Sequence, residues 1–481
     1  MTGENLTGED LTGRRVTVAG LGVSGISAAR ALVRAGARVT VVDGGDSPSH
    51  RARAEELAAE AVAARLGDGD TLPEGTELIV TSPGWPPDSA LFAAAEAAEV
   101  PVWGDVELAW RLRGPDAAPW LAVTGTNGKT TTVRMLAAML EAAGLRTAAV
   151  GNIGTPLIDV VLGEQPYDVL AVELSSYQLH WAPSVRAHSA AVLNLAPDHL
   201  DWHGSMAAYA ADKGRVYEGN EVACVYNRAD PATERLVRAA DVVEGCRAVG
   251  FTLNSPGPSE LGVVEGLLVD RAFVPDRRQQ AEELAEVTDL EPAAPHNIAN
   301  ALAAAALARA YGVPPEAVRE GLRSFRPDTH RIEWVADVDG VAYVDDSKAT
   351  NTHATRASLA AYESIVWVAG GLAKGAEFDD LVTAAADRLR GVVLLGADRA
   401  RIREALTRHA PDVPVVDLER TDTGAMAAAV GEAARLAHPG DTVLLAPACA
   451  SMDMFTNYNR RGEAFADAVR ALAADRTAEH R

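Results

Sequence analysis

The chain contains little cysteine, no long apolar run and no excess of basic residues. Its three cysteines, at positions 224, 246 and 449, are far apart, which predicts neither a disulfide framework nor a thiolate metal site. No stretch approaches the roughly 18 apolar residues of a membrane span, and residues 1–10 lack the basic and apolar regions of a secretory leader. A net charge of −23 opposes nonspecific nucleic-acid binding. We therefore expect a cytoplasmic protein without membrane insertion and without a nucleic-acid partner.

The composition is otherwise that of a soluble globular protein. Hydrophobic residues make up 48% of the 481 residues and charged residues 23%, which argues against extensive disorder. The length exceeds what one hydrophobic core usually organises, so we expect two or three domains. Because the net charge is strongly negative, any anionic substrate must be held by local basic groups, helix N-termini or metal ions.

Apolar strands alternate with helical stretches along the chain, which favours α/β domains with parallel sheets. The first strand, 16–19, leads through a glycine turn and a helix to a second strand at 39–42. A proline-rich stretch at 114–119 has the composition of a linker, and a new strand follows at 120–123. Later in the chain, Asp339 and Gly340 lie between apolar segments and predict a β-hairpin.

The segment TGTNGKTTT, residues 124–132, lies between an apolar strand and a helical stretch. Its glycines allow backbone N–H groups to close around phosphate oxygens, and the N-terminus of the helix favours an anion. Lys129 is spaced to reach the terminal phosphates of a nucleotide, and Thr130 to bind Mg²⁺. Position 123 is valine, so the spacing departs from the usual GxxxxGK[ST] pattern. The segment still predicts a phosphate loop.

A second glycine turn follows the first strand, where Gly20, Gly22 and Gly25 form a GxGxxG pattern, and Asp43 follows the next strand. Such a turn suits NAD, a nucleotide-diphosphate substrate, or a purely structural bend. Two different phosphate-binding turns in one chain favour two phosphorylated ligands. We expect a Rossmann-like nucleotide-binding domain at 1–117, a P-loop ATPase-like domain at 118–326 and a Rossmann-like α/β domain at 327–481.

Polar clusters follow several expected strands of the central region. Glu173 begins one cluster and His199 lies in another. Ligands of open α/β sheets bind beyond the carboxyl ends of the strands, where both side chains should lie. They are therefore candidates for binding metal ions that accompany the nucleotide.

Seven motifs occur in the order seen in the Mur ligases, and together they cover nearly the whole chain. They are GTNGKT at 125–130, ELSS at 173–176, DH at 198–199, HNIANA at 296–301, HR at 330–331, DSKATN at 346–351 and PACAS at 447–451. Three features most resemble the D-glutamate-adding members: GxGxSG at 20–25, TNGK at 126–129, and PACASMD at 447–453 followed by Arg461 and Gly462. The alanine-adding members carry histidine at the position of Asn127.

The resemblance implies a monomeric, ATP-dependent ligase of peptidoglycan precursor synthesis, acting in cell-wall formation and cell division. It would add D-glutamate to UDP-N-acetylmuramoyl-L-alanine. The alanine carboxylate would attack the γ-phosphate of ATP to give an acyl phosphate, and the D-glutamate amine would then displace phosphate. The implied cofactors are ATP, Mg²⁺ at two sites and a carbamylated lysine.

The resemblance also implies roles for individual residues. Lys129, Glu173, His199 and Lys213 would be catalytic, and Thr130, Glu173, His199 and Lys213 would bind Mg²⁺. The ATP-binding set comprises Gly125, Thr126, Asn127, Gly128, Lys129, Thr130, Thr131, Asn297, Asn300, Arg331 and Asp346. The set for the UDP-substrate comprises Gly22, Val23, Ser24, Asp43, Gly44, Gly84, Asn152 and Ser175. The set for D-glutamate comprises Lys348, Thr350, Lys374, Ser451, Met452 and Tyr458.

Lys213 matches the lysine that is carbamylated in this family. A neutral amine can add CO₂, and the carbamate behaves like a carboxylate that can bind Mg²⁺. Without the resemblance, a lysine in this helical stretch would be interpreted as an exposed surface residue. The segment from His199 to Lys213 is one residue shorter than in relatives.

Three other interpretations compete with this one. A nicotinamide-dependent oxidoreductase would explain Gly20, Gly22, Gly25 and Asp43, but neither the phosphate loop nor the third domain. An ATP-gated binding module would need Lys129 but not Glu173 or Lys213. Folylpolyglutamate synthesis uses a similar phosphate loop, but the βαβ unit before the loop argues against it. An ADP-release assay with different amino acids separates these alternatives.

Overall fold

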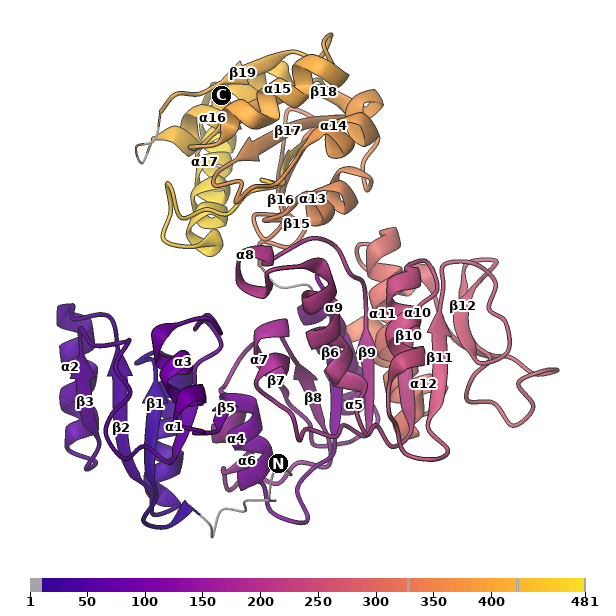
Figure 1. Ribbon diagram of the computed structural model, residues 1–481. Helices are drawn as coiled ribbons and strands as arrows, with labels where there is room; N and C mark the ends of the chain where they lie inside the picture. The colour runs from indigo at the N-terminus through magenta and orange to yellow at the C-terminus, as the bar shows by residue number, and fades with distance from the viewer. Residues whose placement is uncertain (1–10, 327–328, 421, 423, 480–481) are drawn as a thin grey trace. The chain divides into compact units, whose positions relative to one another are not determined.

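The computed structural model describes residues 11–326, 329–420, 422 and 424–479. Pro327 and Asp328, which belong to the expected linker before the third domain, lie outside this range, as do residues 1–10. The described residues form three sheets with helices between the strands (Figure 1). The expected α/β class is confirmed. No helix in the described ranges is long and apolar enough to cross a bilayer.

The first sheet is entirely parallel, in the order β3-β2-β1-β4-β5. Its strands are β1 (Arg15–Ala19), β2 (Arg38–Asp43), β3 (Ala63–Leu66), β4 (Leu78–Thr81) and β5 (Val102–Gly104). Four helices accompany it: α1 (Val23–Arg34), α2 (Pro48–Ala58), α3 (Ala90–Ala97) and α4 (Asp105–Leu112). The βαβ unit predicted from residues 16–42 is therefore confirmed.

The second sheet has the order β14-β13-β12-β11-β10-β9-β6-β8-β7, and only its β12–β14 end is antiparallel. The strands are β6 (Trp120–Thr124), β7 (Ala149–Gly151), β8 (Leu170–Glu173), β9 (Ser189–Val192), β10 (Ala223–Asn227), β11 (Arg247–Phe251), β12 (Glu260–Val264), β13 (Leu267–Asp270) and β14 (Glu282–Glu286). The helices are α5 (Lys129–Ala142), α6 (Leu157–Val161), α7 (Ser176–His180), α8 (Leu200–His203), α9 (Met206–Gly214), α10 (Pro231–Ala239), α11 (Pro295–Tyr311) and α12 (Pro315–Ser324).

The third sheet has the order β15-β16-β20-β17-β18-β19, and β15 alone is antiparallel to its neighbour. The strands are β15 (Glu333–Val338), β16 (Val341–Asp345), β17 (Ile365–Gly370), β18 (Leu389–Leu395), β19 (Val415–Asp417) and β20 (Thr442–Leu445). The helices are α13 (Thr352–Leu359), α14 (Asp379–Ala385), α15 (Arg399–His409), α16 (Ala425–Leu436) and α17 (Tyr458–Glu479).

The predicted hairpin joins β15 to β16. Val338 pairs with Val341, and the two residues between them, Asp339 and Gly340, have φ angles of 52° and 79°. Positive φ at both central residues is what a two-residue type I′ turn requires, and it explains the Asp-Gly pair.

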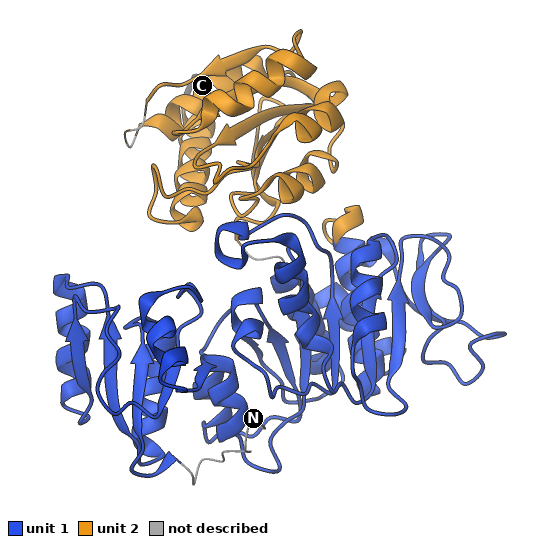
Figure 2. Ribbon diagram, viewed as in Figure 1, with its two compact units in different colours: residues 1–290, 297–325 blue, residues 291–296, 326–481 orange. Residues whose placement is uncertain are grey.

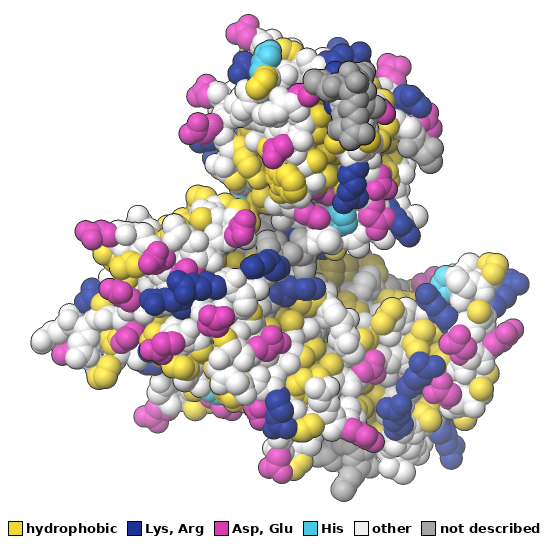
Figure 3. All heavy atoms as spheres, turned by 180° about the vertical axis from the view of Figure 1, so that it is seen from behind, with side chains coloured by type: hydrophobic (Ala, Val, Ile, Leu, Met, Phe, Trp, Pro, Cys, Tyr) yellow, Lys and Arg dark blue, Asp and Glu magenta, His cyan; other side chains and the backbone are white. Residues whose placement is uncertain are grey.

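Apolar side chains cover both faces of the parallel strands, as expected where helices pack on each side. In β17, Ile365 and Trp367 join one hydrophobic cluster, whereas Val366 and Val368 join another. Polar residues lie at the carboxyl ends of these buried strands, where many of the site residues predicted from the sequence are found. On the face shown in Figure 3, acidic and basic side chains are interspersed over the surface.

Contacts divide the chain into two compact units (Figure 2). Unit 1 comprises residues 1–290 and 297–325, and unit 2 comprises residues 291–296 and 326–481. The first expected domain and all of the second except residues 291–296 and 326 lie in unit 1. The boundary near residue 117 therefore stays a prediction. Each unit is described by itself below.

Candidate active site

The phosphate loop follows β6 at the carboxyl edge of the second sheet and leads into α5. Gly125 and Gly128 adopt φ angles of 151° and 86°, which side chains rarely allow. A Cβ atom on Gly128 would lie 2.4 Å from Oδ1 of Asn300. The loop therefore requires glycine at position 128. This contact also brings Asn300, predicted from another part of the chain, beside the loop.

Asn194, just after β9, holds the loop in shape. Its Oδ1 accepts a hydrogen bond from the N–H of Asn127 at 2.9 Å, and its Nδ2 donates to the Asn127 carbonyl at 3.0 Å. Its carbonyl accepts from the N–H of Thr126 at 3.0 Å. Asn194 thus fixes the loop before any ligand binds, a role that the sequence analysis did not assign to it.

A polar pocket lies beside the loop. Six of its lining residues were predicted as site residues: Thr126, Lys129, Asn152, Ser175, His199 and Lys213. Four were not predicted: Ser176, Tyr177, Asp198 and Tyr209. Tyr209 belongs to the site because its hydroxyl lies 2.9 Å from Oγ1 of Thr126. The fold therefore brings together residues from α5, α7, α9 and the loops after β6, β7, β8 and β9.

Glu173 is the last residue of β8 and is only 2% exposed. Its Oε1 accepts a hydrogen bond from Nδ2 of Asn152 at 2.9 Å. Its buried Oε2 accepts no hydrogen bond from any described residue. A buried carboxylate oxygen without a partner is costly. This donor therefore fits a divalent cation, which prefers carboxylate oxygen.

Lys213 is almost completely buried on α9, contrary to the surface position that its local sequence alone predicts. Its Nζ donates to the Gly125 carbonyl at 2.9 Å and lies 3.4 Å from Oγ1 of Thr124. Burial, together with the charge of Lys129, holds the pKa of Lys213 well below its ordinary value. The site therefore favours the neutral amine at this position.

Asp212 anchors α9 next to Lys213. Its carboxylate lies 2.9 Å from Nδ1 of both His180 and His203. Nε2 of His203 in turn lies 2.9 Å from Oγ of Ser176, which lines the pocket. The cluster ties α9 to α7 and fixes the helix that carries Lys213. The sequence alone does not predict this cluster, because its members lie up to 36 residues apart.

His199 lines the pocket from the turn that begins α8, where its φ angle is 54°. Its ring is partly exposed and lies 4.8 Å from the ring of Tyr177. Its Nε2 lies 3.6 Å from Oδ2 of Asp198. The pocket thus holds an imidazole and the carboxylate of Asp198, while Glu173 is hydrogen-bonded to Asn152, which also lines it.

The glycine turn of the first sheet is organised by Asp43. Its two carboxylate oxygens accept hydrogen bonds from the N–H groups of Leu21, at 2.7 Å, and Gly45, at 2.8 Å. A Cβ atom on Gly25 would lie 1.9 Å from the Gly20 carbonyl oxygen, so α1 can approach the turn only with glycine there. Around Gly22, Gly44 and Gly84 the space is open. Asp43 therefore has a structural role in the turn as well as the predicted one.

The residues predicted to bind D-glutamate gather at the carboxyl edge of the third sheet, within unit 2. Nζ of Lys348 lies 3.8 Å from the centre of the Tyr458 ring, which is a cation–π contact. Ser451 is buried, whereas Met452 is 63% exposed. Asp346 is buried and accepts a hydrogen bond from Ser358. Burial raises the pKa of Asp346 to about 7.

Three protein-family models match the chain in succession. The model of the Mur ligase MurD-like N-terminal domain matches residues 14–104, that of the Mur ligase middle domain residues 123–308, and that of the Mur ligase glutamate ligase domain residues 330–449.

Curated relatives match over nearly the whole chain. The UDP-N-acetylmuramoylalanine–D-glutamate ligase of Streptomyces avermitilis is 78% identical over 453 residues, which cover 94% of this chain and 97% of the relative. The ligase of the same name from Streptomyces coelicolor is 77% identical over 456 residues, with the same coverage. That from Thermobifida fusca is 63% identical over 454 residues, again with this coverage.

Solved structures share the fold at low sequence identity. The MurF ligase of Thermotoga maritima in complex with ADP has a TM-score of 0.57 and 16% identity, and covers 98% of this chain and 97% of its own. The UDP-N-acetylmuramate–alanine ligase MurC of the same organism has a TM-score of 0.55 and 17% identity, and covers 95% of this chain and 99% of its own.

Proposed function

Since this chain belongs to the Mur ligase family and is an ATP-dependent amide-bond-forming ligase, we propose that it joins D-glutamate to UDP-N-acetylmuramoyl-L-alanine. The observation that carries the proposal is 78% identity, over 94% of the chain, to a ligase of that name. The nicotinamide-dependent alternative is not favoured, because it leaves the second and third sheets without a role. We further propose that the reaction takes place in the cytoplasm and that the enzyme is a monomer.

The reaction has two steps. An oxygen of the alanine carboxylate attacks the γ-phosphorus of ATP, the bond to the β,γ-bridging oxygen breaks, and ADP leaves. The neutral amine of D-glutamate then attacks the acyl carbon, and the tetrahedral intermediate collapses with loss of phosphate and a proton. Coupling to ATP is needed because a carboxylate has no adequate leaving group. Catalysis of the first step consists mainly of positioning and neutralising the transferring phosphoryl group.

The chain's own residues supply these functions in unit 1. We assign Lys129 to the β- and γ-phosphates and the N–H groups of the glycine loop to the remaining phosphate oxygens. In the described structure Nζ of Lys129 donates to the carbonyls of Gly125 and Thr126 at 2.9 and 3.0 Å. The ammonium is therefore already held over the loop. Asn152 and Ser175 line the same pocket and are assigned to the carboxylate of the UDP-substrate.

The oxygen and nitrogen donors in and beside the pocket would fit Mg²⁺, which would supply charge neutralisation of the phosphates. We assign Thr130 and Glu173 to one ion, because Oε2 of Glu173 is buried without a partner among the described residues. His199 and a carbamate on Lys213 are assigned to a second ion. Without carbamylation, the Lys213 side chain brings a second amine to a pocket that already holds Lys129.

The remaining assignments concern the uridine diphosphate, the nucleotide and D-glutamate. We assign the uridine diphosphate to Gly22, Val23, Ser24, Asp43, Gly44 and Gly84. The open space around the three glycines supports this assignment. Asn297, Asn300, Arg331 and Asp346 are assigned to the nucleotide. We assign D-glutamate to Lys348, Thr350, Lys374, Ser451, Met452 and Tyr458.

An ADP-release assay tests the proposed function. With ATP, Mg²⁺ and UDP-N-acetylmuramoyl-L-alanine present, D-glutamate should stimulate ADP release, and the product should gain the mass of one glutamyl residue. L-Glutamate, L-alanine and meso-diaminopimelate serve as matched amine substrates and should give only the background rate. Equal stimulation by L- and D-glutamate, or stimulation by another amino acid alone, would refute the proposal.

Replacing Glu173 by glutamine tests the first metal assignment. The amide keeps the size of the side chain and an acceptor for Asn152, but it removes the charge. The Mg²⁺ concentration for half-maximal rate should rise by at least about tenfold. Asp168→Asn is the control, because Asp168 lies near the opposite end of the same strand and pairs with Arg146 at the surface. Superimposable Mg²⁺ titrations of Glu173→Gln and the wild type would exclude the assignment.

A further inference from the structure

Arg461 is a buried cation in unit 2 with no role in the reaction as described so far. It lies in the first turns of α17 and is only 2% exposed. Its Nε donates to Oγ of Ser347 at 3.0 Å, and one terminal nitrogen donates to the Ser347 carbonyl at 2.9 Å. The other terminal nitrogen donates to the Cys449 carbonyl at 3.0 Å and lies 3.5 Å from that of Gly370. One guanidinium thus joins three separate segments.

These three segments follow neighbouring strands of the third sheet. Gly370 ends β17, Ser347 comes two residues after β16, and Cys449 comes four residues after β20. In the sheet, β20 lies between β16 and β17, parallel to both. The planar fork of arginine can serve several acceptors at fixed angles, which a lysine ammonium cannot do. Arg461 therefore fixes the relative positions of three loops at the carboxyl edge of the sheet.

The charge of Arg461 is costly at this position. Its hydrogen bonds go to carbonyl and hydroxyl oxygens, which are neutral. Burial lowers its pKa to about 10, so the guanidinium remains charged at neutral pH. A buried cation without a directly bonded anion is less favourable for the stability of a fold than a well-packed apolar side chain. Stability alone is thus a weak reason for an arginine here.

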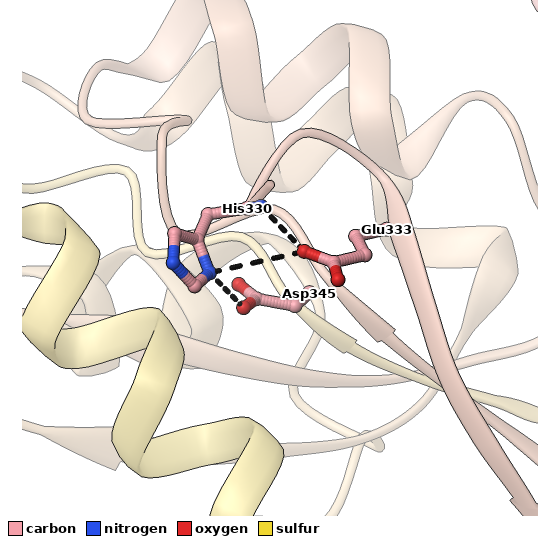
Figure 4. A group of neighbouring side chains, drawn as sticks. All are labelled: His330, Glu333 and Asp345. Atoms are coloured by element: carbon pink, nitrogen blue, oxygen red, sulfur yellow. Dashed lines mark hydrogen bonds and ion pairs between the residues drawn. The ribbon is translucent and has the colours of Figure 1, made fainter. Parts of the chain in front are cut away.

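The residue after Arg461, Gly462, has no side chain and therefore lets α17 lie close to the ring of His330. A Cβ atom on Gly462 would lie 2.2 Å from Nδ1 of His330. Nδ1 of His330 lies 2.7 Å from Oδ2 of Asp345, and Oε2 of Glu333 accepts from the His330 N–H at 2.7 Å (Figure 4). Asp345 in turn accepts from the Ser347 N–H at 2.8 Å. The start of α17 therefore contacts the segment that leads to Lys348 at two points: Arg461 bonds to Ser347, and Gly462 lies against His330 and Asp345.

The loops held by Arg461 carry the side chains assigned to D-glutamate. Lys348 follows Ser347 directly, and Ser451 comes two residues after Cys449. Oγ of Ser347 also donates to the Tyr458 carbonyl at 2.7 Å, while Nζ of Lys348 lies over the Tyr458 ring. Displacing Ser347 would therefore shift Lys348 relative to both Tyr458 and Ser451.

We propose that Arg461 is a positioning residue for the amino-acid substrate: it holds the loops of Lys348 and Ser451 in the arrangement that binds the carboxylates of D-glutamate. The inference rests on the proposed function. It adds a residue that touches no substrate itself and acts only through Ser347, Gly370 and Cys449.

Steady-state kinetics of Arg461→Met and Arg461→Lys test this inference. Methionine fills most of the volume without charge or donors, and the KM for D-glutamate should rise at least about tenfold, as expected when binding groups are misplaced. The KM for UDP-N-acetylmuramoyl-L-alanine should change by less than about twofold, since its assigned residues lie in unit 1. The KM for ATP should rise less than that for D-glutamate, because only part of its assigned set, Arg331 and Asp346, lies in unit 2. Arg461→Lys should be intermediate. Arg470→Met is the control, because Arg470 lies exposed on the same helix and pairs with Asp467; it should match the wild type.

A purely structural role gives a different result. Partial unfolding lowers the active fraction, and hence kcat, without changing the KM for one substrate selectively. An unchanged KM for D-glutamate in Arg461→Met, or an equal rise for all three substrates, would overturn the inference. If Arg461→Met does not fold, Ser347→Ala decides, since it removes one acceptor and should raise the same KM more modestly. A wild-type enzyme that does not use D-glutamate would instead refute the proposed function.

Discussion

Replacing Lys129 with alanine should lower the rate of ligation by at least about a thousandfold, as expected when a cation that stabilises a transferring phosphoryl group is lost. Nζ of Lys129 lies within 3.0 Å of two loop carbonyls, in a pocket that also holds Thr126 and Asn152. No neutral side chain can replace its charge on the γ-phosphate. The rate is measured as ADP release at saturating concentrations of all three substrates.

The fold of the Lys129→Ala variant should stay intact. The hydrogen bonds from Lys129 to the Gly125 and Thr126 carbonyls, which the substitution removes, are each worth about 1 kcal/mol, in a domain whose stability is typically about 5–15 kcal/mol. Thermal unfolding should therefore remain cooperative, with a modestly lower Tm. Arg134→Ala, on the exposed side of the same helix, controls for the loss of a basic residue from α5. Near-normal turnover of Lys129→Ala would refute the phosphate-loop assignment.

The sequence predicted the elements around the glycine-rich segments well, because local conformation and function require the same residue there. Gly128 must adopt a positive φ and lies against Asn300, and Asp339-Gly340 must close a two-residue turn. Such positions tolerate few alternatives, so their residues are informative without any knowledge of tertiary structure. The α/β class followed in the same way from strands that alternate with helices.

Lysine is rare in this chain, and every lysine was predicted as a site residue. Lysine occurs at only four positions, 129, 213, 348 and 374, and all four were predicted as site residues, whereas arginine is used throughout. Arginine is always charged and serves surface ion pairs well, but only lysine can be neutralised and carbamylated. The scarcity of lysine is therefore a sequence feature that could have strengthened the prediction for Lys213.

The supporting residues could not be predicted, because they become neighbours only through the topology of the sheets. Asn194 reaches Asn127 since β9 lies beside β6, although 67 residues separate them. Asp212 and Arg461 act on residues from other elements. Arg461 was noted only as part of a family-like motif, and the local sequence of neither residue predicts its burial. Burial of a charged group is the feature that identifies both, and burial is a property of the folded chain.

Lys213→Ala should also lose nearly all activity, but for a reason that can be separated from that of Lys129. The amine of Lys213 is buried beside the Gly125 carbonyl, and its low pKa favours the neutral form. A neutral amine nitrogen can attack the carbon of CO₂ and release a proton, which leaves a carbamate. Carbamylation thus places a negative charge beside the pocket that Lys129 and His199 line, and Lys213→Ala removes the group that carries it.

Carboxylate rescue distinguishes a carbamate from a plain cation. Truncation to alanine leaves a space at a position where the lysine side chain is only 2% exposed. Acetate or formate can enter this space and supply the oxygen ligands that the second Mg²⁺ would lose. We expect either anion to restore part of the rate of Lys213→Ala at constant ionic strength, with no effect on Lys129→Ala. Lys213→Arg should remain inactive, because a guanidinium cannot be carbamylated.

A spectroscopic measurement tests the same assignment without activity. In ¹³C-bicarbonate the wild-type enzyme should show a carbamate carbon resonance that is absent from Lys213→Ala and Lys213→Arg. Because the chain has only four lysines, Lys374→Ala is a matched control that should retain the resonance. If Lys213 instead contacts phosphate as an ammonium, Lys213→Arg should keep substantial activity, Lys213→Ala should not respond to acetate, and the resonance should be missing from the wild type. That combination would exclude the carbamate and leave the second Mg²⁺ without its proposed anionic ligand.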